Sequence, residues 1–515
     1  MIKKSWFFIL LVLASPAGAS ATATHELFQT HCASCHGANR LGLMGPALLP
    51  ENLKRLKKKS AASVIKNGRA ATQMPAFGEK LKSPEIQSLV DYIYTPLDVM
   101  PVWDKKEINQ SQIIYEDALN LPDQPVWDAD PMNIFVVVEL GDHHATVLNG
   151  DNFTPIHRFA TRFALHGGPK YSNDGRYVFF GSRDGWVSKY DLYNLKTVAE
   201  VRAGINIRNI AVSGDGRYVI AANYLPHSLV ILDASDLSLI KILHVKDRKG
   251  NSSRVSAVYT AEPRDSFVAA LKDAAEVWEI SYSDNPPPGF ADWEHDYREE
   301  SGDVVKPDPF PVRHISIKSH LDDFFFNQDY DLLLGASREG KGQVVSLDVR
   351  RTIGKLDIPG MPHLGSGITW KYKGRTVMAT PNLKENIVSI VDMDSWQTIK
   401  RIKTLGPGFF MRSHEKTNYA WVDVFFGEHK DAVHIIDKRT LDIVKTLRPA
   451  PGKTAAHVEF DKEGKHALLS IWDIDGAVIV YDAETFKEIK RLPMKKPSGK
   501  YNVHNKITRS AGTSH

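Results

Sequence analysis

The sequence predicts a small all-α domain followed by an all-β eight-bladed β-propeller. Three observations support this division. The 515-residue chain begins with a short apolar run, two closely spaced cysteines follow it, and a strand pattern then recurs at intervals of mostly 42 to 48 residues. Recurrence of short alternating strands with this period is typical of a propeller.

The composition is that of a folded globular protein, with 42% hydrophobic and 24% charged residues. The length predicts about three domains at about 150 residues each. The net charge of +4 is too small to indicate a nucleic-acid partner, so any anion site must be local. With only two cysteines, the chain is neither a disulfide-rich scaffold nor a four-cysteine zinc or iron–sulfur protein.

The N-terminus is typical of an export signal. Lys3 and Lys4 precede an apolar run at residues 6–13, and small residues follow at 19–23. The run is too short to span a bilayer, although a permanent membrane anchor is the alternative interpretation. We therefore expect residues 1–23 to be a signal peptide. The mature protein is expected in the periplasm of a Gram-negative bacterium, without a membrane span.

Soon after this segment, residues 32–36 read Cys-Ala-Ser-Cys-His, the C-x-x-C-H pattern of covalent haem attachment. The thiols of Cys32 and Cys35 add to the two haem vinyl groups, and the imidazole of His36 lies under the iron. A thioredoxin-like disulfide is the alternative, but the adjacent histidine and the lack of a following strand–helix unit argue against it. The pattern predicts haem c with His36 as an iron ligand.

The sixth iron ligand is expected to be Met74, since a thioether raises the potential of the iron. Met44 is the competitor, although its Leu-Met-Gly-Pro context suits a turn on the proximal side of the haem. A helix is expected to begin at residues 83–85, with proline in its first turn and an apolar face after it. Residues 24–97 therefore predict a single-haem cytochrome c domain, an electron carrier that does not itself define a substrate.

Residues 98–131 are rich in proline and lack sustained periodicity, so we expect a linker that lies on the next domain. Between residues 132 and 515, eight runs of β-branched and aromatic residues recur, six ending in Asp and two degenerate. Their marker residues are 149, 191, 233, 281, 348, 392, 437 and 482. The spacings predict eight blades, with an insertion around residues 286–309 in the longest gap. A β-sandwich, the alternative, does not explain the regular period.

Counting back 23 to 29 residues from seven of these markers reaches a histidine or an arginine. Equivalent positions of the blades lie at one height around the channel of a propeller. Imidazoles ligate iron and guanidiniums bind carboxylates, so the ring suits a second, non-covalent tetrapyrrole with acidic side chains. For any single histidine, a hydrogen-bonded strand-end imidazole is the alternative. The seven residues are His166, Arg208, Arg254, His320, His363, His414 and His457.

A C-x-x-C-H domain joined to an eight-bladed propeller resembles the cytochrome cd1 group, whose propeller holds haem d1. The resemblance covers nearly the whole mature chain. The segments that carry it are 163–166, 175–177, 362–367 and 497–503. It implies that His166 is the proximal ligand of the d1 iron and that Arg183 and Arg208 lie near acidic substituents of the ring.

Two functions occur on the scaffold of this group. Reductases convert nitrite to nitric oxide at an open iron position beside two histidines, and a biosynthetic relative oxidises a propionate of dihydro-haem d1 to an acrylate. This sequence departs from the reductases, because Asp322 stands where the first distal histidine is expected and His320 comes two residues earlier. His363 matches the second histidine. The cytochrome domain also lacks the longer N-terminal part that reductases carry.

Residues 409–414 resemble the segment that gives the biosynthetic relative a distal ligand, which implies His414 as a second axial imidazole that closes the iron to nitrite. We therefore expect an oxidoreductase that catalyses the last step of haem d1 biosynthesis for denitrification. His320 is the expected base. His144 is a second base or proton acceptor, with a solvent loop at a blade end as the alternative.

Electrons are expected to pass to haem c and then to a periplasmic acceptor, and the product to the nitrite reductase that uses haem d1. The alternatives are a nitrite reductase in which His320 and His363 act as acids, and a haem d1 carrier without chemistry.

Overall fold

The computed structural model describes residues 17–43, 45–53, 56–68, 74–99, 101–165, 168–287, 289–290, 308–337, 340 and 342–508, with side chains from residue 22. These residues form two compact units, one before residue 100 and one after it. Four parts of the sequence predictions lie outside the described residues: residues 1–16 of the signal peptide, Met44, His166, and residues 288 and 291–307 of the predicted insertion. Among the helices described, none is both long and apolar enough to cross a membrane.

The first unit is all-α, as predicted. Its helices are α1 (Ala17–His31), α2 (Ala33–His36), α3 (Pro50–Leu53), α4 (Lys58–Asn67) and α5 (Ser83–Ile93). Helix α5 starts where the sequence indicated, with Pro84 in the first turn and the backbone N–H of Lys82 donating to Glu85 Oε2 at 2.6 Å. Its apolar face packs against Phe28 of α1, which builds the core of the unit.

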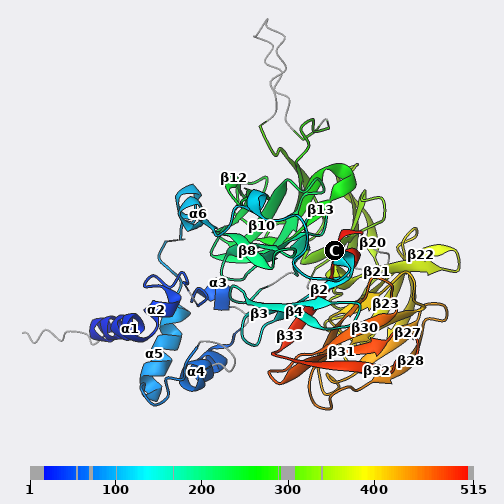
Figure 1. The fold of residues 1–515 in the computed structure, drawn as a ribbon. Helices are drawn as coiled ribbons and strands as arrows, with labels where there is room; N and C mark the ends of the chain where they lie inside the picture. The colour runs from blue at the N-terminus through cyan, green and yellow to red at the C-terminus, as the bar shows by residue number, and fades with distance from the viewer. Residues whose placement is uncertain are drawn as a thin grey trace, which may run out of the picture. The chain divides into compact units, whose positions relative to one another are not determined.

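The second unit is a propeller of eight sheets, counted over the described residues (Figure 1). The first three blades are β5 (Lys170–Tyr171), β6 (Tyr177–Gly181), β7 (Trp186–Asp191) and β8 (Lys196–Arg202); β9 (Asn206–Val212), β10 (Tyr218–Leu225), β11 (Ser228–Asp233) and β12 (Leu239–His244); and β13 (Val255–Ala261), β14 (Ser266–Leu271), β15 (Glu276–Ser281) and β16 (Val312–Ser316). The next two are β17 (Asp323–Phe326), β18 (Leu332–Ala336), β19 (Gly342–Ser346) and β20 (Arg351–Leu356); and β21 (Ile368–Tyr372), β22 (Arg375–Pro381), β23 (Ile387–Asp392) and β24 (Thr398–Lys403).

The last three blades are β25 (Met411–Ser413), β26 (Tyr419–Asp423), β27 (Val433–Asp437) and β28 (Asp442–Leu447); β29 (Ala455–Phe460), β30 (His466–Ile471), β31 (Gly476–Asp482) and β32 (Glu488–Met494); and β33 (Pro497–Asn502) with β2 (Ile134–Glu139), β3 (His144–Asn149) and β4 (Pro155–Ala160). The eighth blade joins the two ends of the propeller, because C-terminal β33 pairs antiparallel with N-terminal β2. This pairing closes the ring of blades.

The predicted linker folds onto the propeller. It contains α6 (Lys105–Ser111), β1 (Ile113–Ile114), η1 (Ala118–Asn120) and η2 (Pro131–Asn133). Strand β1 extends the first blade by pairing with β8, and Ile108 is fully buried between the first two blades. The indole N–H of Trp103 donates to the carbonyl of Arg202 at 2.7 Å. The remaining short helices are η3 (Glu262–Arg264), η4 (Leu364–Ser366) and α7 (Val503–Ile507).

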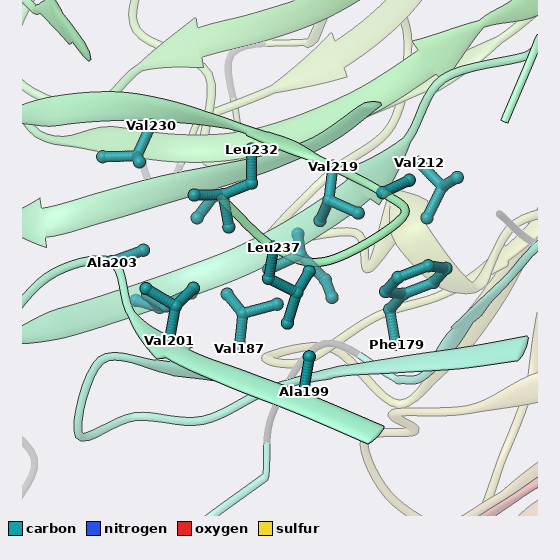
Figure 2. Close-up of a cluster of buried hydrophobic side chains, with 14 of the residues drawn as sticks. Phe179, Val187, Ala199, Val201, Ala203, Val212, Val219, Val230, Leu232 and Leu237 are labelled. Carbon is teal, nitrogen blue, oxygen red and sulfur yellow. The ribbon is translucent and has the colours of Figure 1, made fainter. Parts of the chain in front are cut away.

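The core lies between neighbouring blades. Figure 2 shows Phe179, Val187 and Ala199 of the first blade beside Val219 and Leu232 of the second, all buried. Burial of a large aliphatic or aromatic side chain contributes about 1.5–3 kcal/mol, so packing between blades stabilises the ring at each junction.

The direction of the strands decides which loops meet around the central axis. The first strands of neighbouring blades contact one another, as β9 does β13 and β25 does β29, and form the inner wall. In every blade, the segment before the first strand and the turn between the second and third strands lie at the same end of the ring. We call this end the entry face. The turn after each first strand lies at the opposite end.

Candidate functional site

The cysteine–histidine motif occupies a single helical turn. The backbone N–H of His36 donates to the carbonyl of Cys32 at 2.9 Å, which brings both thiols and the imidazole to one side of α2. Cys32 and Cys35 are half-buried free thiols. This spacing suits two covalent bonds to one macrocycle.

The imidazole of His36 is held for iron ligation. Its Nδ1 lies 2.8 Å from the carbonyl oxygen of Pro46, which leaves Nε2 as the nitrogen for a metal. A Cβ on Gly45 would lie 2.8 Å from the ring, so only glycine fits there. Burial lowers the pKa of His36, which favours the neutral form that a metal needs. Met74 is partly buried against the core of the unit beside Phe77, and its role as the sixth ligand stays a prediction.

Several predicted residues of the propeller gather at the entry face. His320 and His363 lie in the segments before β17 and β21, Arg183 lies in the turn between β6 and β7, and His144 begins β3. Arg208 lies on the inner strand β9.

Three guanidinium groups surround Tyr224. The Cζ atoms of Arg183 and Arg254 lie 5.8 and 5.6 Å from the centre of its ring, and Arg208 interacts electrostatically with its hydroxyl. Arg254 is also fixed by a two-pronged ion pair with Asp273. The structure therefore brings Arg183 and Arg208 together with Arg254, and three guanidiniums so close together suit a ligand with carboxylates.

Asp323 links this basic group to the segment that carries His363. Its Oδ1 accepts from the hydroxyl of Tyr259 at 2.8 Å, and its Oδ2 accepts from the backbone N–H of Gly365 at 2.9 Å. Burial raises the pKa of Tyr259 well above its usual value, and the Asp323 carboxylate adds to the shift. The tyrosine hydroxyl therefore stays protonated and holds the carboxylate in place.

His363 has one ring nitrogen engaged and one for a ligand. Nδ1 lies 2.6 Å from the carbonyl oxygen of Phe409, and the imidazole stacks on the Phe409 ring with centroids 4.2 Å apart. Burial lowers the pKa of His363. Its Nε2 is thus a neutral imidazole nitrogen, suited to iron or to a proton.

His457 and Tyr501 form a second group beside the Phe409–Phe410 segment. The His457 ring lies 4.8 Å from that of Phe410 and 5.2 Å from that of Tyr501. His457 Nδ1 is buried and, within the described part of the chain, has no hydrogen-bond partner. Burial, reinforced by Lys500, Arg412 and Lys506, lowers the pKa of His457 well below its usual value. A neutral imidazole with an unpaired nitrogen has a lone pair available to accept a proton.

His457 belongs to the ring of basic residues predicted from the sequence, but no role was predicted for it, and Tyr501 was not predicted as a site residue. A signal was available for each. His457 stands 25 residues before its marker, as His166 does, and Tyr501 lies within the C-terminal segment that carries the resemblance.

Buried ionisable side chains surround this group, and basic residues outnumber acidic ones. Lys500 is fully buried, and its Nζ donates to Ser470 Oγ at 2.7 Å and to the carbonyl of His457. Burial lowers the pKa of Lys170 to about 8 and that of Lys506 to about 7. The charged residues that interact here are Lys170, Arg208, Arg412, Lys500 and Lys506 with Asp323, Asp423 and Glu459. Such an excess of basic side chains suits an anionic ligand, whose charge would stabilise their protonated forms.

His320 and His144 are more exposed. His320 is exposed in its loop, and the side chain of His144 is 31% exposed, with Nδ1 2.9 Å from the carbonyl oxygen of Asp142. Neither belongs to the set of contacts described above that joins His363, His457 and Tyr501.

His414 lies at the opposite end of the inner wall. It directly follows β25, packs 6.3 Å from the ring of Phe460 at the end of β29, and would meet a Cβ on Gly464 in the next turn. His363, by contrast, contacts Phe409, which precedes β25. The structure therefore does not bring His414 to the entry face, because the strand β25 separates it from that end. We leave it out of the proposed site.

Comparisons with known proteins agree with this architecture. The family described as cytochrome D1 heme domain matches residues 129–506, and the family described as cytochrome C oxidase, cbb3-type, subunit III matches residues 19–93. The chain therefore belongs to the cytochrome D1 heme domain family, and a cytochrome c domain precedes the propeller in the sequence. Both parts of the predicted fold are confirmed.

Individual relatives are similar to this chain over most of its length. Dihydro-heme d1 dehydrogenase of Pseudomonas aeruginosa is 52% identical over 506 residues, which cover 98% of each chain. A solved structure of dihydro-heme d1 dehydrogenase NirN in complex with DHE gives a TM-score of 0.87 at 52% identity, over 94% of this chain and 99% of that chain. Nitrite reductase of Stutzerimonas stutzeri is 22% identical over 541 residues, covering 94% of this chain and 92% of the relative.

Proposed function

We propose that this protein oxidises dihydro-haem d1 to haem d1, converting one propionate side chain to an acrylate. One observation carries the proposal: the His457 imidazole, with Nδ1 unpaired among the described residues, contacts Tyr501 and Phe410, and the ring of Phe410 also contacts His363. Similarity to dihydro-heme d1 dehydrogenase over the whole chain supports the choice of substrate.

The substrate is held by its iron and by its carboxylates. Arg183 and Arg208, with Arg254 beside them, bind the acidic side chains. His166 is the proximal axial ligand, as the resemblance implies. We assign the second axial position to His363 rather than to His414, because the bond of Nδ1 to Phe409 leaves Nε2 for the iron. Two axial imidazoles leave no open position for nitrite.

The oxidation removes two protons and two electrons as the CH2–CH2 unit becomes CH=CH. His457 takes the first proton on Nδ1, the buried ring nitrogen that has no partner among the described residues. Tyr501, whose ring contacts that of His457, orients the side chain, and its hydroxyl relays the second proton toward solvent. His320 and His144 pass protons from the entry face to solvent.

Haem c, bound at Cys32, Cys35 and His36, supplies a one-electron outlet for the oxidation. With haem c bound there, the two electrons would leave one at a time to a periplasmic electron acceptor. The predicted signal peptide supports a periplasmic location, and the nitrite reductase that uses haem d1 is the proposed recipient of the product.

The proposal is tested by adding dihydro-haem d1 to the oxidised holoprotein without oxygen. We expect the absorbance bands of haem c to change to those of the reduced form as the pigment is converted. A pigment that binds and remains unchanged while haem c stays oxidised would identify a carrier instead.

A further inference from the structure

Asp423 is a buried acidic residue that joins two segments of the site. Burial raises its pKa to about 7, and the backbone N–H groups of Phe409, Phe410 and His457 oppose this shift. Asp423 is the last residue of β26 and is fully buried. Its Oδ1 accepts from the backbone N–H groups of Phe409 and Phe410 at 2.7 and 3.1 Å, and its Oδ2 accepts from that of His457 at 3.2 Å. One side chain thus holds the segment before β25 and the inner strand β29.

The hydrogen bonds that Asp423 accepts support the imidazoles of His363 and His457. The carbonyl of Phe409 is the group that binds His363 Nδ1, and the Phe409 ring stacks on the same imidazole. On the other side, the Asp423 carboxylate holds the backbone of His457, whose ring contacts Phe410. Movement of this carboxylate would shift both imidazoles together.

His457 needs such a restraint because its backbone is strained. Its φ is +55°, a left-handed conformation that is uncommon for a residue other than glycine, and the pairing of β29 with β30 shifts register beside it. The hydrogen bond that its N–H donates to Asp423 Oδ2 stabilises this conformation.

We propose that Asp423 is a positioning residue, which fixes the distance and orientation between His363 and His457 in the tetrapyrrole site. This role rests on the proposed function, because it assigns the two imidazoles to the iron and to the substrate side chain. In this proposal the Asp423 side chain contacts neither the iron nor the substrate side chain.

An amide cannot replace this carboxylate. Asparagine has one oxygen, and its NH2 group would face the backbone N–H of either Phe409 or His457. Asp423→Asn therefore breaks one of the two connections while conserving shape. Asp392→Asn is the matched control, since Asp392 is also buried and accepts from the backbone N–H groups of Asp394 and Ser395, at the end of β23.

The test compares haem d1 bound to the two variants and to the wild-type holoprotein. We expect Asp423→Asn to bind haem d1 within about threefold of the wild-type Kd, to lose the low-spin electron paramagnetic resonance signal of two axial imidazoles, and to turn over dihydro-haem d1 at least about tenfold more slowly. Asp392→Asn should match the wild type in all three. A wild-type spin state and rate in Asp423→Asn would overturn the proposal.

A measurement on the wild type covers the case in which Asp423→Asn does not fold. The backbone amides of Phe409, Phe410 and His457 should exchange with deuterium at least about 100-fold more slowly than those of an unstructured peptide. Fast exchange at these three amides would also overturn the proposal. If the wild-type protein gives the low-spin signal but leaves dihydro-haem d1 unchanged, the proposed function fails, and the spin states of the two variants still decide the role of Asp423.

Discussion

Two imidazoles in this protein are oriented in the same way, by a backbone carbonyl on Nδ1. His36 uses the carbonyl of Pro46 at 2.8 Å, and His363 uses that of Phe409 at 2.6 Å. Both therefore present Nε2, the arrangement typical of an iron ligand. His457 differs, because its Nδ1 is buried and unpaired in the described part of the chain. At the residue scale, the hydrogen bonds of each imidazole distinguish the candidate iron ligands, His36 and His363, from the candidate base, His457.

Replacing His457 by Ala should lower the turnover of dihydro-haem d1 by about 100-fold to 10,000-fold, the usual range for loss of a general base. Binding of the pigment should change little, because the arginines and the iron ligands remain. Steady-state kinetics with a parallel binding titration measures both quantities. His320→Ala should reduce turnover less, and a larger loss in His320→Ala than in His457→Ala would return the role of base to His320.

Arg208 and Arg183 should control affinity rather than rate. Arg208→Gln removes a guanidinium near Tyr224, so we expect a rise of about tenfold in the Kd of dihydro-haem d1, as for loss of a charge-assisted bond of about 1.4 kcal/mol. Arg375→Gln is the control, because its side chain is 71% exposed on β22. Equal affinities of wild type and Arg208→Gln in a fluorescence-quenching titration would exclude this role.

At the scale of elements, the repeat is visible in the sequence because each third strand ends in a side chain with a structural task. Asp392 and Asp482 accept from backbone N–H groups in the turns that follow β23 and β31. Such turns need a short acceptor at that position. The recurrent Asp is therefore a cap for the turn to the fourth strand, which explains why the spacing could be counted without a structure.

A histidine on β27 gives the propeller a pH dependence of its own. His434 accepts from the backbone N–H of Leu405 through Nε2, at 3.1 Å, and its Nδ1 bonds Thr446 at 2.8 Å. Burial lowers its pKa from the usual value of 6.5 to about 4, with a smaller contribution from Arg448. The unfolded chain therefore binds more protons than the folded chain between pH 6.5 and 4, and stability is lost as pH falls through this window.

We expect the free energy of unfolding to fall by about 2 kcal/mol between pH 7 and pH 5 through His434 alone. Urea unfolding followed by tryptophan fluorescence at the two pH values measures this loss. His434→Gln should show a smaller decrease than the wild type. An identical decrease in both proteins would assign the pH dependence to other groups.

For the whole molecule, periodicity and motif spacing were enough to predict the fold. The haem c motif is local in sequence, and the blade period is a regular count, so both could be read directly. The predicted ring of histidines and arginines was less informative about the site. Counting back from a marker residue does not show at which end of the inner wall a side chain lies. Both His414 and His457 belong to that ring, yet His414 follows the inner strand β25 and His457 lies within the inner strand β29.

Long-range contacts explain what the sequence could not predict. Tyr501 meets His457 because the C-terminal strand β33 completes the blade begun by β2 and lies next to β29. Asp423 accepts hydrogen bonds from Phe409 and His457, which lie in segments far apart in the sequence. Closure of the ring creates these neighbours, and the register of each inner strand decides which side chains reach the channel.

The mass of the pigment is the most direct test of the central claim. Purified dihydro-haem d1 is incubated with the oxidised holoprotein and an excess of a one-electron acceptor, then extracted and analysed by mass spectrometry. A pigment lighter by two hydrogens, with two equivalents of acceptor reduced for each molecule, is the expected result. An unchanged mass, in a protein that carries haem c and binds the pigment, would contradict the account.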